Sequence, residues 1–246
     1  SQIGVPLSVL NINSTHNLGI FEAGISLPGE MKRLEKIIQP DVGILTNIGN
    51  AHDEGFKNRT QKIREKLVLF RHAKQVIYCA DDKDVYNEIS AFQRTHQTLQ
   101  LVSWGRKSFN PVRLISVKKN NLDSVIEVAC QKKSYSITIP FLDDASVENA
   151  LNCFCVLMIF NKTNKATLDR FQTLYPVAMR LELKQGINHC TIINDSYSND
   201  LYSFNIALDF LKQQKQHPVH TVILSDILQS GRKPQELYHE IASLLR

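Results

Sequence analysis

Two residues near the start of the chain follow apolar runs and could bind a metal ion. Glu22 comes directly after the run at residues 19–21, and His52 follows a second run that ends near Ile48. In parallel sheets ligands gather at the carboxyl ends of strands, and a carboxylate there can hold Mg²⁺, which prefers oxygen ligands. Both residues also have plainer interpretations. Glu22 could cap a loop, and a single loop histidine is often an ordinary surface residue.

Lys66 is a third candidate for chemistry. It stands beside Ile63, Leu67 and Phe70, at the margin of the apolar face of an expected helix. Partial burial lowers the pKa of a lysine because it desolvates the charged form. A neutral amine can react with CO₂ to give a carbamate, an anionic oxygen ligand for a metal, whereas a protonated lysine cannot act as a ligand. The alternative is a lysine whose stem covers the apolar rim while its charge stays in water.

Two more candidates lie in the last third of the chain. Asp195 opens a polar run, residues 195–200, after an apolar segment, where it could bind a ligand or cap the next helix. Arg180 could contact a phosphate group with two parallel hydrogen bonds. The sequence contains no GxGxxG, GxSxG or HExxH motif. It also lacks GxxxxGK[ST], the loop that cradles phosphates in many ATP-binding proteins.

The apolar pattern predicts an α/β fold with a mostly parallel sheet and flanking helices. In the first part we expect strands at residues 17–21, 41–48 and 75–80, which alternate with helices at residues 28–39, 60–70 and 82–92. An antiparallel meander of strands at residues 112–117, 124–130 and 134–139 follows, and then helices at residues 146–160 and 167–174. The last part mixes both again, with strands at residues 181–184, 190–193 and 219–224 and helices at residues 201–212 and 234–245. We expect two domains, residues 1–174 and 175–246.

Composition narrows the classes of protein that fit. The 246 residues carry a net charge of +5 without a long basic run, so we expect no nucleic-acid partner. No stretch of about 18 apolar residues occurs, so we expect no membrane insertion. Five cysteines without a CxxC pair indicate buried free thiols in a reducing cytosol. Because the chain opens on Ser1 and stops inside a helical pattern, we expect it to be part of a longer protein.

Short segments in the same order along nearly the whole chain resemble the Mur ligase family, the ATP-dependent amide ligases of peptidoglycan synthesis. The most informative segments are Phe21-Glu22-Ala23-Gly24, Thr46-Asn47-Ile48, Ala51-His52-Asp53-Glu54-Gly55-Phe56, Glu65-Lys66, Glu148-Asn149-Ala150-Leu151 and Asp195-Ser196-Tyr197. The resemblance implies a central ATPase domain lacking its N-terminal phosphate loop in residues 1–174. It implies the first part of a Rossmann-like C-terminal ligase domain in residues 175–246.

The resemblance also implies roles for single residues. Glu22 would bind one Mg²⁺, His52 would bind a second Mg²⁺, and Lys66 would be the lysine that becomes carbamylated; these three would be the catalytic and metal-binding residues. Asn149 would contact the adenine of ATP, while Arg180 and Asp195 would contact the nucleotide from the C-terminal domain. Two places depart from the family pattern. Asp143-Asp144-Ala145-Ser146 replaces the usual Gly-Arg-His-Asn, and Asp200-Leu201 replaces an asparagine and a proline.

The branch most similar to this chain joins D-alanyl-D-alanine to UDP-N-acetylmuramoyl-tripeptide in the bacterial cytoplasm, through an acyl phosphate. The segments at residues 194–197 and 224–231 resemble a Bacteroidetes form in which an alanine racemase domain follows the ligase. Without a phosphate loop, this chain alone is expected to be inactive. Two alternatives stay open: a related ligase such as folylpolyglutamate synthase, and a non-catalytic α/β domain that binds a nucleotide or a partner.

Overall fold

A six-stranded sheet organises the first two thirds of the chain in the computed structural model, which describes residues 2–49, 52–175, 179–197, 200–214, 216–227, 230 and 232–245. The sheet order is β1-β2-β3-β4-β5-β6. Its strands are β1 (Val42–Leu45), β2 (Gln75–Cys79), β3 (Gln100–Gly105), β4 (Val112–Lys119), β5 (Ser124–Cys130) and β6 (Lys133–Ile139). Pairing is parallel from β1 to β4 and antiparallel from β4 to β6. The expected parallel sheet and the expected meander are thus one continuous sheet.

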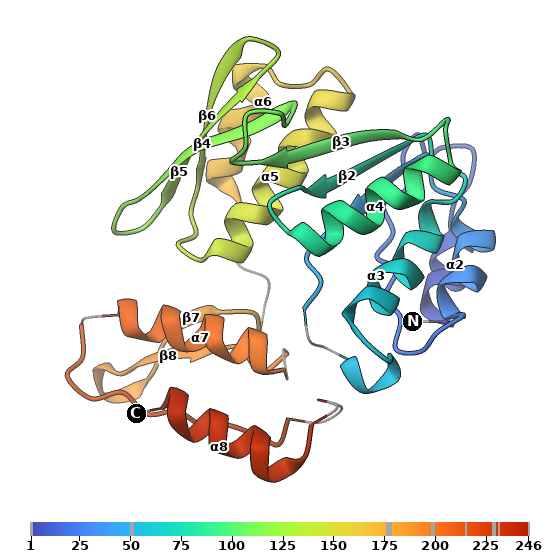
Figure 1. Cartoon of the computed structure of the whole chain (residues 1–246). Coiled ribbons are helices and arrows are strands. Elements are labelled where there is room, and N and C mark those ends of the chain that lie inside the picture. The colour runs from blue at the N-terminus through green and yellow to red at the C-terminus, as the bar shows by residue number, and fades with distance from the viewer. Residues whose placement is uncertain are drawn as a thin grey trace.

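Helices pack on both faces of the sheet or against neighbouring helices. They are α1 (Gly4–Leu10), α2 (Glu30–Ile38), α3 (Arg59–Leu67), α4 (Lys83–Thr95), α5 (Asp144–Ile159) and α6 (Lys165–Asp169). Figure 1 shows α3 and α4 on one face and α5 on the other. Strand β2 alternates between them, because Val76 and Tyr78 pack in the cluster with α3 and α4, whereas Ile77 packs in the cluster with α5. The alternation fixes which side chains face each helix layer.

The larger of these two clusters lies between α5 and the sheet. Phe154 and Leu151 of α5 are fully buried there, and the Phe154 ring meets the edge of Tyr135 at 5.2 Å between centroids. The indole Nε1 of Trp104 donates a 2.8 Å hydrogen bond to Asn152, so this buried donor is satisfied. The apolar contacts bind α5 to β2 and β3 and thereby set the position of its N-terminal turn.

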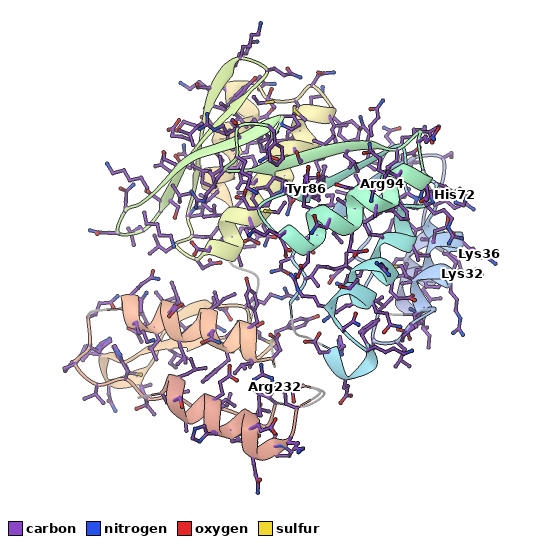
Figure 2. All side chains as sticks on the ribbon, in the orientation of Figure 1. Lys32, Lys36, His72, Tyr86, Arg94 and Arg232 are labelled. Atoms are coloured by element: carbon purple, nitrogen blue, oxygen red, sulfur yellow. The ribbon has the colours of Figure 1, made fainter. Side chains whose placement is uncertain are left out.

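The last part of the chain has a smaller core. Strands β7 (Glu182–Gln185) and β8 (Thr191–Asn194) form an antiparallel pair, followed by α7 (Leu201–Gln213) and α8 (Pro234–Leu244). Figure 1 shows these elements in orange and red, away from the β4–β6 meander. One buried cluster joins the two helices; it comprises Leu201, Ile227, Leu237 and Ile241. Figure 2 shows Arg232 beside α8, where it pairs with Glu240, while Lys32 and Lys36 project from α2.

Two of the expected strands are wrong. Residues 17–21 form no strand, and Leu18 and Ile20 are 61% and 84% exposed. Residues 219–224 also form none, with Ile223 96% exposed. Both segments are apolar enough for a strand, but neither has a hydrogen-bonded neighbour or a core to cover. Conversely, α1 and β3 were not predicted. Pro176 and the residues at 198, 199, 228, 229 and 231 lie outside the described residues.

Among the described residues, no helix combines the length and the apolar character needed to cross a membrane. The cysteines there are all free, but they differ in exposure: Cys130 and Cys155 are buried, whereas Cys153 and Cys190 are exposed. The expectation that the thiols are buried therefore holds for only some of them.

Candidate functional site

The carboxyl ends of β1, β2 and β3 meet at one edge of the sheet because these strands are parallel. His52 lies in the loop that follows β1. Its backbone φ is 61°, in the left-handed region that non-glycine residues seldom adopt, and its carbonyl accepts a 3.1 Å hydrogen bond from the Gly55 amide. The short helix η1 (Asp53–Gly55) starts there. The imidazole is exposed, so this turn presents it to solvent.

Two cations from α3 hold the loop that carries His52. Lys62 donates 2.7 Å hydrogen bonds to the Gly49 carbonyl and to the Asp53 carboxylate. Arg59 reaches the Ile48 carbonyl at 3.4 Å and pairs with Asp82, which caps α4 at the end of β2. The loop is therefore attached to the start of α3 and to the end of the neighbouring strand.

Glu22 lies in an exposed stretch before α2. The following turn is fixed by carboxylates: Glu30 accepts hydrogen bonds from the Ser26 and Leu27 amides, which lower the pKa of Glu30. Glu65, the neighbour of Lys66, accepts a 2.9 Å hydrogen bond from the Gly29 amide. These bonds connect the segment after Glu22 to both α2 and α3.

The Glu22 segment also touches the His52 loop directly. A Cβ at Gly55 would lie 1.9 Å from the Ser26 carbonyl oxygen, so only a glycine allows this approach. Phe56 and Ile25 share a buried cluster with Met31 and Leu34 of α2. The two loops are therefore packed against each other, although they are separated by about 30 positions in the sequence.

Lys66 is half-buried on α3, one turn after Lys62. Burial lowers the pKa of the Lys66 amine, and the charge of Lys62 lowers it further; the charge of Glu22 acts in the opposite direction. Glu22 and Lys66 are thus close enough to influence each other. A lowered pKa increases the fraction of neutral amine, the form that carbamate formation needs, relative to a lysine whose charge stays in water.

A small pocket of about 70 Å³ opens at the same edge of the sheet. Its walls come from the ends of β1, β2 and β3, from the start of α4 and from α5: Leu45, Thr46, Asn47, Cys79, Asp82, Val85, Trp104, Glu148 and Asn152. Burial raises the pKa of Glu148, with added repulsion from Asp144 and Asp82, and burial raises the pKa of Cys79 to about 11. Asn149 is exposed on α5, next to the wall residue Glu148.

Arg180 and Asp195 come together in the second part of the chain. The Asp195 carboxylate accepts a 3.0 Å hydrogen bond from the Leu181 amide, and the Arg180 guanidinium lies 4.4 Å from the ring centroid of Tyr197. Met179 and Leu181, on either side of Arg180, both have positive φ. Burial raises the pKa of Asp195, and the Leu181 hydrogen bond and the charge of Arg180 partly offset this. The arginine is therefore presented by a strained turn.

At both places that depart from the family pattern, an aspartate caps a helix. Asp143 caps α5 by accepting from the Ser146 amide at 2.7 Å, and Asp200 caps α7 by accepting from the Ser203 amide at 3.0 Å. In each case the serine hydroxyl also donates to the aspartate. Asp195 therefore does not cap α7, and its carboxylate stays in the turn with Arg180.

The two parts of the site approach each other at the end of β1. Tyr202, in the first turn of α7, lies close enough to Asn47, which lines the pocket, for Asn47 to lower the pKa of its hydroxyl, although burial raises this pKa more. The charge of Asp143 at the start of α5 raises the pKa of Asp195. Glu22, Lys66 and the His52 loop thus form one group, Arg180 and Asp195 form a second, and α5 with Asn149 lies at the pocket wall.

Sequence reasoning missed the residues that hold these loops: Arg59, Lys62, Glu65, Tyr197 and Tyr202. One signal was available for Lys62. It stands four positions before Lys66 and beside Ile63, so both lysines share one margin of the same apolar stripe. The partners of Lys62 come from another loop, and spacing on the helix could not identify them.

Comparison with known proteins assigns the family. The sequence model of the Mur ligase middle domain matches residues 1–157. This chain belongs to the Mur ligase family. The resemblance found in the short segments is thereby confirmed for the first two thirds of the chain, which contain Glu22, His52, Lys66 and Asn149.

Curated relatives extend the similarity to almost the whole chain. UDP-N-acetylmuramoyl-tripeptide--D-alanyl-D-alanine ligase of Bacillus subtilis is 23% identical over 248 residues, covering 100% of this chain and 52% of the relative. The protein of the same name in Buchnera aphidicola subsp. Baizongia pistaciae is 24% identical, with coverage of 98% and 52%. The chain spans about half the length of the curated relatives it matches.

Solved structures share the fold. A crystal structure of MurF from Acinetobacter baumannii superposes with a TM-score of 0.85 and 22% identity, covering 98% of this chain and 52% of that one. MurF ligase from Thermotoga maritima in complex with ADP gives a TM-score of 0.73 and 20% identity, with coverage of 89% and 50%. The apo form of FPGS from L. casei gives 0.62 and 15%, with coverage of 78% and 47%. The mixed α/β fold predicted from the sequence is confirmed.

Proposed function

We propose that this chain is part of an ATP-dependent amide ligase that joins D-alanyl-D-alanine to UDP-N-acetylmuramoyl-tripeptide during peptidoglycan synthesis in the bacterial cytoplasm. Curated relatives with this name align with almost the whole chain. The observation that carries the proposal is Lys66, a half-buried amine with a lowered pKa that lies within electrostatic range of Glu22. In this proposal residues 1–174 form the central domain and residues 175–246 begin the C-terminal domain.

Each candidate residue has a role that its surroundings support. The neutral Lys66 amine attacks the carbon of CO₂ and releases one proton to solvent, which leaves a carbamate with two oxygens. Glu22 adds a carboxylate, and His52 presents an imidazole from its fixed turn. Arg180 offers a planar cation to a phosphate group, because the Tyr197 ring supports one face of the guanidinium. Asp195 orders the turn that carries Arg180, and Asn149 offers its amide to a base bound beside α5.

The donor set fits two Mg²⁺ ions and ATP. Among the described residues no three of His, Cys, Asp and Glu gather as a closed metal cage. Mg²⁺ suits such an open site because it keeps several waters and binds through one or two protein ligands plus substrate phosphates. ATP, when bound, would supply the phosphoryl group that activates the substrate carboxylate, and the Mg²⁺ ions would offset the negative charge of that phosphoryl group. This chain's residues then hold the carboxylates in place.

The test uses the whole polypeptide encoded by the reading frame that contains this sequence. Phosphate release from ATP is measured with UDP-N-acetylmuramoyl-tripeptide, with and without D-alanyl-D-alanine. We expect release to require both substrates, to disappear in Lys66→Ala, and to return when short-chain carboxylates are added to that variant. Lys74→Ala is the matched control, because Lys74 is an exposed lysine paired with Asp41 at the opposite end of β2.

Other outcomes contradict the proposal in different ways. Release that requires a folate and glutamate would point to a ligase of the FPGS kind. Nucleotide binding without turnover, with Lys66→Ala changing only stability, would point to a non-catalytic α/β domain. The fused alanine racemase stays a prediction from the resemblance at residues 224–231.

A further inference from the structure

Lys62 is a buried lysine that donates hydrogen bonds to Gly49 and Asp53 on the loop after β1. Only 3% of its surface is exposed, whereas Asp53 keeps 43% of its side chain in solvent. Burying an ammonium group is unfavourable unless the charge is paired and hydrogen-bonded. Here the Nζ atom donates to the Gly49 carbonyl and to the Asp53 carboxylate, both at 2.7 Å, and lies 6.0 Å from the Phe56 ring centroid.

The two acceptors stand on either side of His52. Gly49 precedes it by three positions and Asp53 follows it directly, so one ammonium group connects both ends of the turn. His52 itself has a φ of 61°, a conformation that persists only where the surroundings impose it. Lys62 comes from α3, one helical turn before Lys66, so the residue that fixes the turn and the candidate ligand Lys66 share one rigid element.

We propose that Lys62 is a positioning residue, whose ammonium group holds the His52 turn at a fixed place relative to Lys66. Loss of Lys62 should loosen the turn, and this effect does not depend on the proposed function. It should also weaken binding of the ion that His52 would hold, and this second effect rests on the proposed function. A purely structural role is the competing explanation: Lys62 would then support α3 as a whole, with no particular effect on the turn.

The first experiment measures amide hydrogen exchange in the whole polypeptide. Lys62→Met keeps an unbranched side chain that is one atom shorter, and it removes the hydrogen bonds to Gly49 and Asp53 together with the charge. We expect exchange at residues 52–56 to rise about tenfold, while exchange in α3, β2 and α4 stays unchanged. Lys74→Met is the control and should change neither, because its lysine is exposed and pairs only with the surface residue Asp41.

A second variant keeps the experiment informative if Lys62→Met fails to fold. Asp53→Asn removes the charged partner on the exposed side and leaves the Gly49 bond in place, so it should raise exchange at residues 52–56 by a smaller factor, about threefold. Unchanged exchange at these residues in both variants, or an equal rise in α3, would overturn the proposal.

The kinetic test separates metal binding from general damage. In the phosphate-release assay, we expect Asp53→Asn and Lys62→Met to raise the Mg²⁺ concentration for half-maximal rate about threefold or more, while the KM for D-alanyl-D-alanine stays within about twofold. An equal rise in both constants would mean a structural role only. If the unmodified protein releases no phosphate with these substrates, the proposed function fails, and the exchange experiment still decides the role of Lys62.

Discussion

The two groups of candidate residues are held in place by different means. Around Lys66 and His52, buried side chains fix the loops: Lys62 is inside the protein, and Phe56 packs in an apolar cluster. Around Arg180, exposed contacts fix the turn, since Tyr197 is 63% exposed and stacks on a guanidinium in solvent. The first arrangement is stiff because its interactions are shielded from water. The second depends on contacts that water weakens, which suits a part that changes position when a ligand binds.

The largest effect tests whether the two regions are stable independently. Phe154→Ala removes a fully buried ring that α5 packs against the sheet, and it should lower the free energy of unfolding by about 3–5 kcal/mol. Leu237→Ala empties part of the small cluster between α7 and α8. Urea unfolding of the 246-residue chain, followed by the fluorescence of Trp104, its single tryptophan, reports the first region. We expect only Phe154→Ala to shift this transition; an equal shift in Leu237→Ala would show one cooperative unit.

The next effect tests the contact between the Glu22 segment and the His52 loop. Gly55→Ala would place a methyl group 1.9 Å from the Ser26 carbonyl oxygen, so the two loops must separate, at a cost of about 1–3 kcal/mol. Gly24→Ala is the matched control, because a Cβ there meets no atom within 4 Å. Thermal unfolding should distinguish the two variants. Equal stability would mean that the loops adapt and that the first region is less rigid than its packing indicates.

A smaller effect tests the exposed support of Arg180. Tyr197→Leu removes the ring face and should weaken nucleotide binding about two- to fivefold, the equivalent of an exposed cation–π contact of about 0.5–1 kcal/mol. Tyr197→Phe keeps the ring and should bind as the unmodified protein does. Isothermal calorimetry with ADP on the whole polypeptide measures both. A loss in Tyr197→Phe as large as in Tyr197→Leu would assign the role to the hydroxyl group instead.

The smallest effect concerns pH and the pocket at the end of the sheet. Because the pKa of Glu148 is raised, the folded state holds this proton at pH values where the unfolded chain has released it. The stability that results is present below about pH 4.5 and is lost as pH rises through the folded-state pKa. Glu148→Gln should therefore be more stable than the unmodified chain at pH 7, with the difference shrinking toward pH 4.5. Urea unfolding across this range measures it, and a constant difference would contradict the assignment to ionisation.

Local sequence patterns predicted many of the helices and strands, and they also predicted the family. The apolar alternation of residues 124–130 predicted β5 without error, and the stripe at Ile63 and Leu67 predicted most of α3. The order of short segments also identified the family, because each segment keeps its residue types and its place along the chain. The segments at 17–21 and 219–224 misled for the opposite reason, since an apolar run does not show whether a neighbouring strand is present to pair with it.

Only the tertiary structure decided which side chains hold the site together. The sequence places Gly55 and Ser26 about 30 positions apart, and nothing local indicates that they touch. Lys62 has the spacing of a solvent-facing lysine on the margin of a helix, yet the loop after β1 folds over it and accepts its hydrogen bonds at Gly49 and Asp53. Periodicity along one element determines that element, because its side chains share one geometry. Contacts between elements depend on how loops close in space, and that is fixed only when the whole core packs.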